Sequence, residues 1–160
     1  MSALKDSWNR LTGMLSGSFI ESVVLLMTRI GLGMIFWNSY KTKVAEGTLF
    51  QPNDTIDFLF REEYAGLPIP TDIAIPMTIY AEFLLPLLIF AGLFTRFGAL
   101  ALMGMALVIQ VFIYPTLQHF LGWDMMVLAL GAVLVTRGPG MFSLDAILGR
   151  ATGFHTPKAA

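Results

Sequence analysis

Residues 73–114 read IAIPMTIYAEFLLPLLIFAGLFTRFGALALMGMALVIQVFIY, and this stretch decides the fold. It holds two long apolar runs, 73–94 and 97–114, separated only by Thr95 and Arg96. At a rise of about 1.5 Å per residue, each run predicts a helix of roughly 25–33 Å, which is long enough to cross the hydrocarbon core of a bilayer. The two-residue link makes these helices antiparallel neighbours.

Two further apolar runs, about 19–40 and 120–136, bring the number of predicted spans to four. Residues 115–118 join the third span to the fourth. Only 13% of the 160 residues are charged and 56% are hydrophobic, whereas about 25% of the residues in a soluble domain are charged. The composition therefore excludes a soluble enzyme domain and predicts an all-α, antiparallel four-helix bundle that is integral to a membrane.

The remaining residues divide the chain around one membrane domain, 19–148. Residues 1–18 carry apolar side chains at helical spacing and predict an interfacial segment, whereas 149–160 predict a flexible tail. The net charge of −1 gives no reason to expect nucleic acid as a partner. The chain has no cysteine and two histidines, so thiolate metal sites are excluded and we expect no bound metal.

The connection between the first two spans, residues 41–72, carries six acidic residues and only three basic ones. Asn53 or Asp54 can cap a short amphipathic helix there, and that helix would end at Gly66 and the 68–70 stretch, whose prolines cannot continue it. A connection of about 30 residues with its own apolar stripe favours a lid packed on the mouth of the bundle.

Lysine and arginine counts predict the orientation. The two termini and the 95–96 turn carry six of these residues, and the opposite side carries three. The positive-inside rule therefore predicts cytoplasmic termini and an extracytoplasmic 41–72 connection.

Several stretches together resemble the DoxX family of small four-helix membrane proteins. They are RIGLGMIF (29–36), NDTIDFLFREEYAGLPIP (53–70), GLFTRFGALAL (92–102) and RGPGMFSLD (137–145), with Glu82 inside the second span. The resemblance implies the four-span fold and a location in a bacterial inner membrane. It also implies a role such as that of the membrane subunits of thiosulfate:quinone oxidoreductases or of oxidative-stress complexes, with quinone and a redox protein as partners.

Two charged residues fall inside the predicted spans. Arg29 lies about ten residues into the first span and Glu82 about nine residues into the antiparallel second span, so both are expected at a similar depth. A charge at the bilayer centre costs at least about 2.5–3.5 kcal/mol and must face the interior with a partner. We therefore predict an Arg29–Glu82 ion pair, which either fixes the helix register or serves a function.

A second polar cluster is predicted near the outer interface, where it would suit a quinone head group. His119 would move protons and Asp124 would orient or receive them. These two residues lie five apart, which does not stack them ideally on one helix face, although His119 could fold back from a loop. Alternatively, His119 and Gln110 are ordinary wetted interface residues. The expected members are Trp37, Asn38, Lys41, Gln110, Tyr114, His119, Trp123 and Asp124.

Three functions remain open from the sequence. The first is a quinone-linked oxidoreductase subunit that works with a soluble or membrane redox partner. The second is a non-enzymatic scaffold that docks partners on the acidic 41–72 connection. The third is a small transporter or metal-handling protein that uses the mid-membrane ion pair and forms a homo-oligomer. No catalytic or cofactor motif is recognisable, so the catalytic residues are not assigned.

Overall fold

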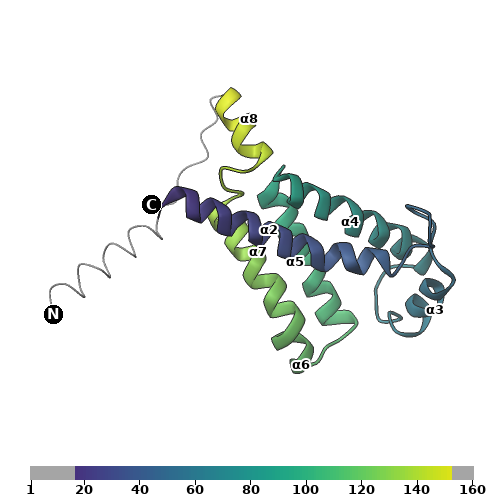
Figure 1. Ribbon diagram of the computed structural model, residues 1–160. Coiled ribbons are helices and arrows are strands. Elements are labelled where there is room, and N and C mark those ends of the chain that lie inside the picture. Colours follow the sequence, from purple (N-terminus) through teal and green to yellow (C-terminus); the bar gives the residue numbers. More distant parts are fainter. Residues whose placement is uncertain (1–16, 153–160) are drawn as a thin grey trace.

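The structure, a computed structural model, describes residues 17–152. Four of its helical segments are long and apolar enough to cross a membrane, which confirms the predicted all-α fold. The expected bounds of the spans agree with the observed ones to within about three residues. In chain order and with the labels of Figure 1, the elements are α2 (Ser18–Lys41), α3 (Asp54–Glu62), α4 (Thr71–Ala91), α5 (Thr95–Phe112), α6 (Leu117–His119), the π-helical turn η1 (Phe120–Asp124), α7 (Met125–Arg137) and α8 (Leu144–Thr152).

Two predictions concern the ends of the chain. The interfacial segment 1–18 lies outside the described residues except for its last two positions. The predicted tail 149–160 is partly helical, because α8 continues to Thr152. The remainder of that tail also lies outside the described residues.

The four spanning segments form a closed arrangement in which α2 contacts α4, α4 contacts α5, α5 contacts α7, and α7 returns to α2. Figure 1 shows two arms, one made of α2 and α4 and the other of α5 and α7, which diverge toward α3 and α6. A cluster of buried apolar side chains holds the arms together. Its buried members are Leu25, Leu32, Phe36, Ile89, Ala99, Leu102, Ala106, Val127 and Leu134.

The 41–72 connection covers the end of the α2–α4 arm, and we call it the lid. The side chain of Asn53 caps α3 by accepting hydrogen bonds from the backbone N–H groups of Thr55 (3.2 Å) and Ile56 (3.0 Å). Ile56 and Phe60 are buried against the ends of α2 and α4. The predicted short amphipathic helix is therefore confirmed, with Asn53 as its cap. The end of the bundle that carries the lid is called the lid end below.

At the opposite end, the chain turns tightly between α4 and α5. Gly92 ends α4 with a φ of 66°, a conformation that suits glycine. The carboxylate of Asp145 then accepts hydrogen bonds from the first backbone N–H groups of α5, those of Phe94 (2.8 Å) and Thr95 (3.0 Å). The backbone N–H of Asp145 donates to the carbonyl oxygen of Gly92 at 2.9 Å. The first turn of α8 thus caps a different helix, α5.

Arg29 reaches into the same junction. Arg29 is completely buried, and its Nη2 atom donates to the carbonyl oxygen of Phe142. Asp145 provides the nearby negative charge. Three sequence stretches that are distant along the chain, around Arg29, Gly92 and Phe142, therefore meet around one guanidinium group.

Replacing Gly92 with alanine should destabilise this junction. The new Cβ would lie against Nη1 of Arg29 and 2.5 Å from Cβ of Ser143, at a backbone φ that alanine disfavours. We expect the free energy of unfolding to fall by about 1–3 kcal/mol. The measurement is unfolding of the purified protein in detergent micelles, followed by circular dichroism.

Gly104→Ala is the matched control, because a Cβ added at Gly104 in α5 meets nothing within 4 Å. Its stability should be unchanged or slightly higher. Equal losses for the two variants would show that the crowding around Arg29 does not hold the junction.

Candidate functional site

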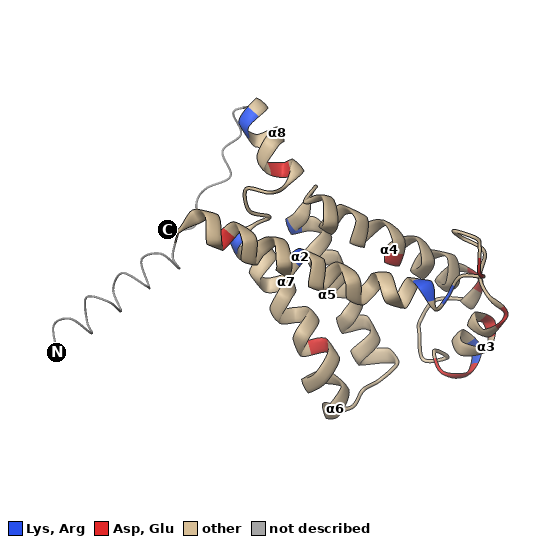
Figure 2. Ribbon diagram, viewed as in Figure 1, with Lys and Arg blue, Asp and Glu red and all other residues tan. Residues whose placement is uncertain are grey.

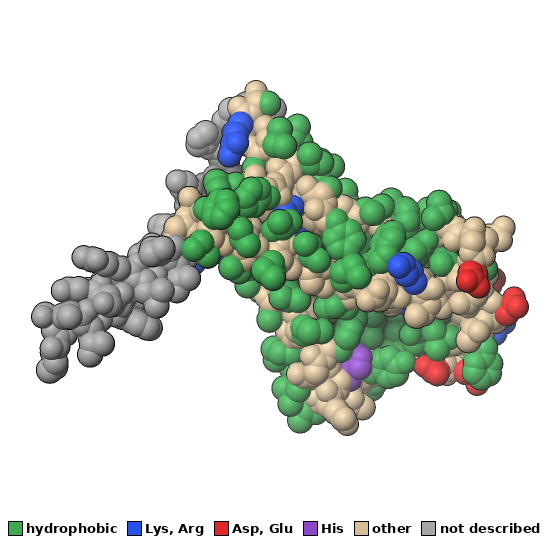
Figure 3. Space-filling view, in the orientation of Figure 1, with side chains coloured by type: hydrophobic (Ala, Val, Ile, Leu, Met, Phe, Trp, Pro, Cys, Tyr) green, Lys and Arg blue, Asp and Glu red, His purple; other side chains and the backbone are tan. Residues whose placement is uncertain are grey.

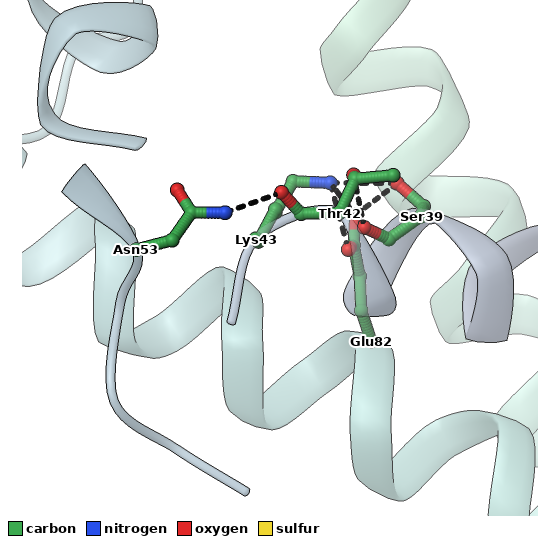
Figure 4. A network of polar contacts seen from close by, with 5 residues as sticks. All are labelled: Ser39, Thr42, Lys43, Asn53 and Glu82. Carbon is green, nitrogen blue, oxygen red and sulfur yellow. Dashed lines mark hydrogen bonds and ion pairs between the residues drawn. The ribbon is translucent and has the colours of Figure 1, made fainter. Parts of the chain in front are cut away.

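Glu82 lies buried at the lid end, where it binds Lys43 (Figure 4). The Nζ atom of Lys43 lies 3.0 Å and 2.8 Å from the two carboxylate oxygens of Glu82. It also donates to Oγ of Ser39 at 2.6 Å, and Ser39 in turn donates to Glu82 at 3.1 Å. Asn53 ties the lid to the same place by donating to the carbonyl oxygen of Thr42 at 2.8 Å. The network fixes the start of the lid on α4.

The predicted Arg29–Glu82 ion pair is therefore wrong. Arg29 lies at the level of Gly92, whereas Glu82 lies at the level of Ser39. Ten residues separate Arg29 from Ser39 on α2, which corresponds to about 15 Å along the helix. The prediction measures the depth of Arg29 from the first apolar residue of α2. The first turns of α2, however, extend beyond the end of α4, so Arg29 and Glu82 do not lie at equal depth. In those first turns, Ser22 packs against the segment around Gly140.

His119 and Asp124 form the second buried polar group, also away from the Arg29 junction. The Nδ1 atom of His119 lies 2.6 Å from Oδ2 of Asp124. The π-helical turn η1 explains this contact, because the N–H of Met125 bonds to the carbonyl oxygen of Phe120, five residues earlier. This wider turn brings residues five apart onto one face, and such turns are frequent at functional sites.

The neighbours of His119 determine where its proton lies when the ring is neutral. Gln110 donates through Nε2 to the carbonyl oxygen of Thr116 at 3.2 Å, so its Oε1 is the atom that faces Nδ1 of His119, also at 3.2 Å. Both partners of Nδ1, Gln110 Oε1 and Asp124 Oδ2, are acceptors. Nδ1 therefore carries the hydrogen and Nε2 has the free lone pair.

Aromatic rings enclose His119 itself. Its ring centroid lies 4.9 Å from that of Tyr114 and 5.6 Å from that of Trp123, with interplanar angles of 32° and 38°. Tyr114 and Trp123 are predicted from the sequence to lie beside a bound head group, but the ring between them is that of His119. The His119 side chain is 23% exposed, and Figure 3 shows the surface of the molecule hollowed between the two arms on this face.

The lid contacts this cluster through the residues that directly follow α3. The hydroxyl of Tyr114 donates to Oε2 of Glu63 at 3.1 Å, and the ring of Tyr64 meets that of Tyr114 edge to face. Gly66 lies so close to α5 that a Cβ there would be 2.5 Å from the carbonyl oxygen of Phe112. Burial and Glu63 raise the pKa of Tyr114, so this phenol remains a hydrogen-bond donor at neutral pH.

Three residues expected in the polar cluster lie elsewhere. Trp37 packs toward α4, against Phe83 and Phe90. The Nζ atom of Lys41 lies over the Trp37 ring, 6.0 Å from its centroid. Asn38 is exposed. Trp37 and Lys41 instead line an open recess of about 520 Å³ beside lid residues 44–49.

Four functional neighbours were missed from the sequence: Ser39, Lys43, Glu63 and Tyr64. Lys43 lies two residues after the end of α2, and this position in the sequence indicates an ordinary interfacial cation. Lys43 is buried only because the lid packs over it. Nothing in the local sequence signals that contact. Within residues 17–152, no group of three or more metal-binding side chains was found.

A double-mutant cycle on Lys43 and Glu82 should reveal strong coupling. Lys43→Met or Glu82→Leu alone leaves one buried charge without its partner and should cost about 3–5 kcal/mol of unfolding free energy. The double variant should cost clearly less than the sum of the two. The measurement is again the free energy of unfolding in micelles.

The exposed Asp57–Arg61 pair on α3, 3.4 Å apart, is the control cycle, and its coupling should stay below about 1 kcal/mol. Additive losses at Lys43 and Glu82 would contradict the buried network. Coupling of Glu82 to Arg29 instead would restore the pair that the structure excludes.

Comparison with known proteins agrees with the four-helix fold. The DoxX family model matches residues 24–115, which run from the second turn of α2, through the lid, to the end of the α5–α6 connection. The match covers Arg29, the Lys43–Glu82 network and Gln110, and it ends before His119 and Asp124. Searches of curated proteins and of solved structures returned no match. The chain belongs to the DoxX family.

Proposed function

We propose that this DoxX family protein is a membrane subunit of an oxidoreductase system that binds a quinone-type head group beside His119 and Asp124. The observation that supports this is the buried Asp124 carboxylate, which holds the partly exposed imidazole of His119 in one tautomer. A fixed imidazole with a free Nε2 is suited to exchanging a proton with a ring-bound oxygen. The quinone, when bound, supplies the redox chemistry.

The fit to such a head group rests on unused hydrogen-bonding capacity. Among residues 17–152, Oδ1 of Asp124 is buried without a partner, and Nε2 of His119 makes no hydrogen bond. Both atoms lie in a helical segment, Leu117–Arg137, that is apolar enough to cross a membrane. A lipid-soluble ring can therefore approach this site from the hydrocarbon.

The proposal includes an orientation. With the lid outside a bacterial inner membrane and the termini in the cytoplasm, the six acidic side chains of the lid face the extracytoplasmic space. Figure 2 shows acidic residues gathered around α3. All six are exposed, while Lys43 is buried in the ion pair. This acidic surface supports docking of a redox partner with a basic face.

The same surface favours a second candidate, a scaffold that holds a partner at the membrane without binding quinone. The two candidates differ in one observable property. A scaffold keeps its partner when Asp124 is changed, and its His119–Asp124 site binds no quinone. The mid-membrane ion-pair transporter is not proposed, because Arg29 and Glu82 do not meet.

Binding of a short-tailed quinone analogue, supplied in both its quinone and its hydroquinone form, to the protein in lipid nanodiscs tests the first function. We expect saturable binding that weakens about tenfold or more in Asp124→Asn, because a charged hydrogen bond to His119 is lost. Isothermal titration calorimetry gives the dissociation constants.

Asp57→Asn, which removes an exposed carboxylate on α3, should bind like the unmodified protein. If the unmodified protein shows no saturable binding, or if Asp124→Asn binds equally well, the quinone site is not where we place it.

Neutralising the lid tests partner docking. The triple variant Asp57→Asn, Glu62→Gln, Asp72→Asn should retain less of a basic partner protein on affinity purification, and low salt should accentuate the difference. Glu21→Gln, an exposed acid at the end opposite the lid, is the control and should leave recovery unchanged. Equal recovery from both variants would contradict docking on the lid.

A further inference from the structure

The hydrogen-bonding positions still open on the side chains of His119 and Asp124 are of one kind. Nδ1 of His119 is held by two acceptors, Asp124 Oδ2 at 2.6 Å and Gln110 Oε1 at 3.2 Å. The other ring nitrogen, Nε2, is therefore an acceptor in the neutral ring. Oδ1 of Asp124, the other free atom, is a carboxylate oxygen and also accepts.

Two donors next to the site are already in use. Nε2 of Gln110 donates to the carbonyl oxygen of Thr116 at 3.2 Å. The hydroxyl of Tyr114 donates to Glu63 at 3.1 Å. A ligand that offers only carbonyl oxygens would therefore face acceptors at both open atoms, Nε2 of His119 and Oδ1 of Asp124.

We propose that the site selects its ligand in the reduced, hydroxyl-bearing form: a hydroquinone rather than the corresponding quinone. This inference rests on the proposed function and specifies the form of the ligand that the same site recognises. A hydroquinone O–H donates to Nε2 of His119, while a quinone carbonyl cannot. An unpartnered buried acceptor is costly, so a ligand O–H that donates toward Oδ1 of Asp124 adds to the preference.

His119 is then placed to take a proton at Nε2. In that step the O–H bond of the ligand breaks and an N–H bond forms at Nε2. The two bonding electrons stay on the ligand oxygen, which becomes a phenolate. The imidazole becomes an imidazolium, and its new positive charge lies against the carboxylate of Asp124. No electron leaves the ligand, so this proton transfer needs no oxidant.

Three ligands of the same ring shape test the selection. They are a short-tailed hydroquinone, its quinone, and the bis-O-methyl ether of the hydroquinone, which has no O–H group. Binding to the protein in nanodiscs is measured by calorimetry without oxygen. We expect the hydroquinone to bind at least about tenfold more tightly than either of the others.

A double variant assigns the preference to the two acceptors. His119→Phe with Asp124→Asn keeps an aromatic ring between Tyr114 and Trp123, and it removes both Nε2 and the buried charge. We expect the hydroquinone and its bis-methyl ether to bind this variant equally. Monodisperse elution and an unchanged helical spectrum verify its fold. If it does not fold, the ligand series on the unmodified protein decides alone.

The outcomes separate this proposal from the proposed function. If the quinone binds the unmodified protein as tightly as the hydroquinone, the selection is overturned and the indole N–H of Trp123 becomes the candidate donor, but the quinone-type site stands. If the bis-methyl ether binds as tightly, the O–H group is not recognised and the selection is overturned as well. If none of the three binds, both proposals fail.

Discussion

The register between α2 and α4 is the constraint on which the rest of the structure depends, and the buried guanidinium of Arg29 marks it. Arg29 lies at the level of Gly92, where α4 has ended, and it binds the carbonyl oxygen of Phe142. A buried charge of this kind is expensive to leave without partners. The junction therefore forms only when α2, the α4–α5 turn and the segment before α8 have come together.

This register has a consequence for the polar groups farther along the helices. Because Arg29 is held at the level of Gly92, Glu82 lies about 15 Å away along the bundle and meets Ser39 and Lys43 instead. The lid is thereby fixed on the α2–α4 arm. Its last turn then reaches across to Tyr114, beside His119. A structural ion pair and the candidate ligand site are thus connected through the lid, although different arms carry them.

The sequence was sufficient for those features that depend on local patterns. Apolar run lengths gave the four spans, and Asn53 was correctly expected among the caps of the lid helix. The Arg29–Glu82 pair failed because run length fixes how many residues cross a bilayer but does not fix which residues of two helices lie at equal depth. The His119–Asp124 contact depends on one π-helical turn, and a spacing of five residues does not by itself reveal such a turn. Lys43 was missed because its burial arises only from the lid's tertiary packing.

In the neutral ring, His119 presents an unprotonated Nε2 because Asp124 and Gln110 hold its proton on Nδ1. The most direct test is ¹⁵N NMR of the imidazole in the protein with His155→Gln, so that His119 is the only histidine. At a pH where the ring is neutral, the account predicts a protonated, pyrrole-type Nδ1 and an unprotonated, pyridine-type Nε2. A pyrrole-type Nε2 would contradict the account, because the site would then offer a donor where the geometry places an acceptor.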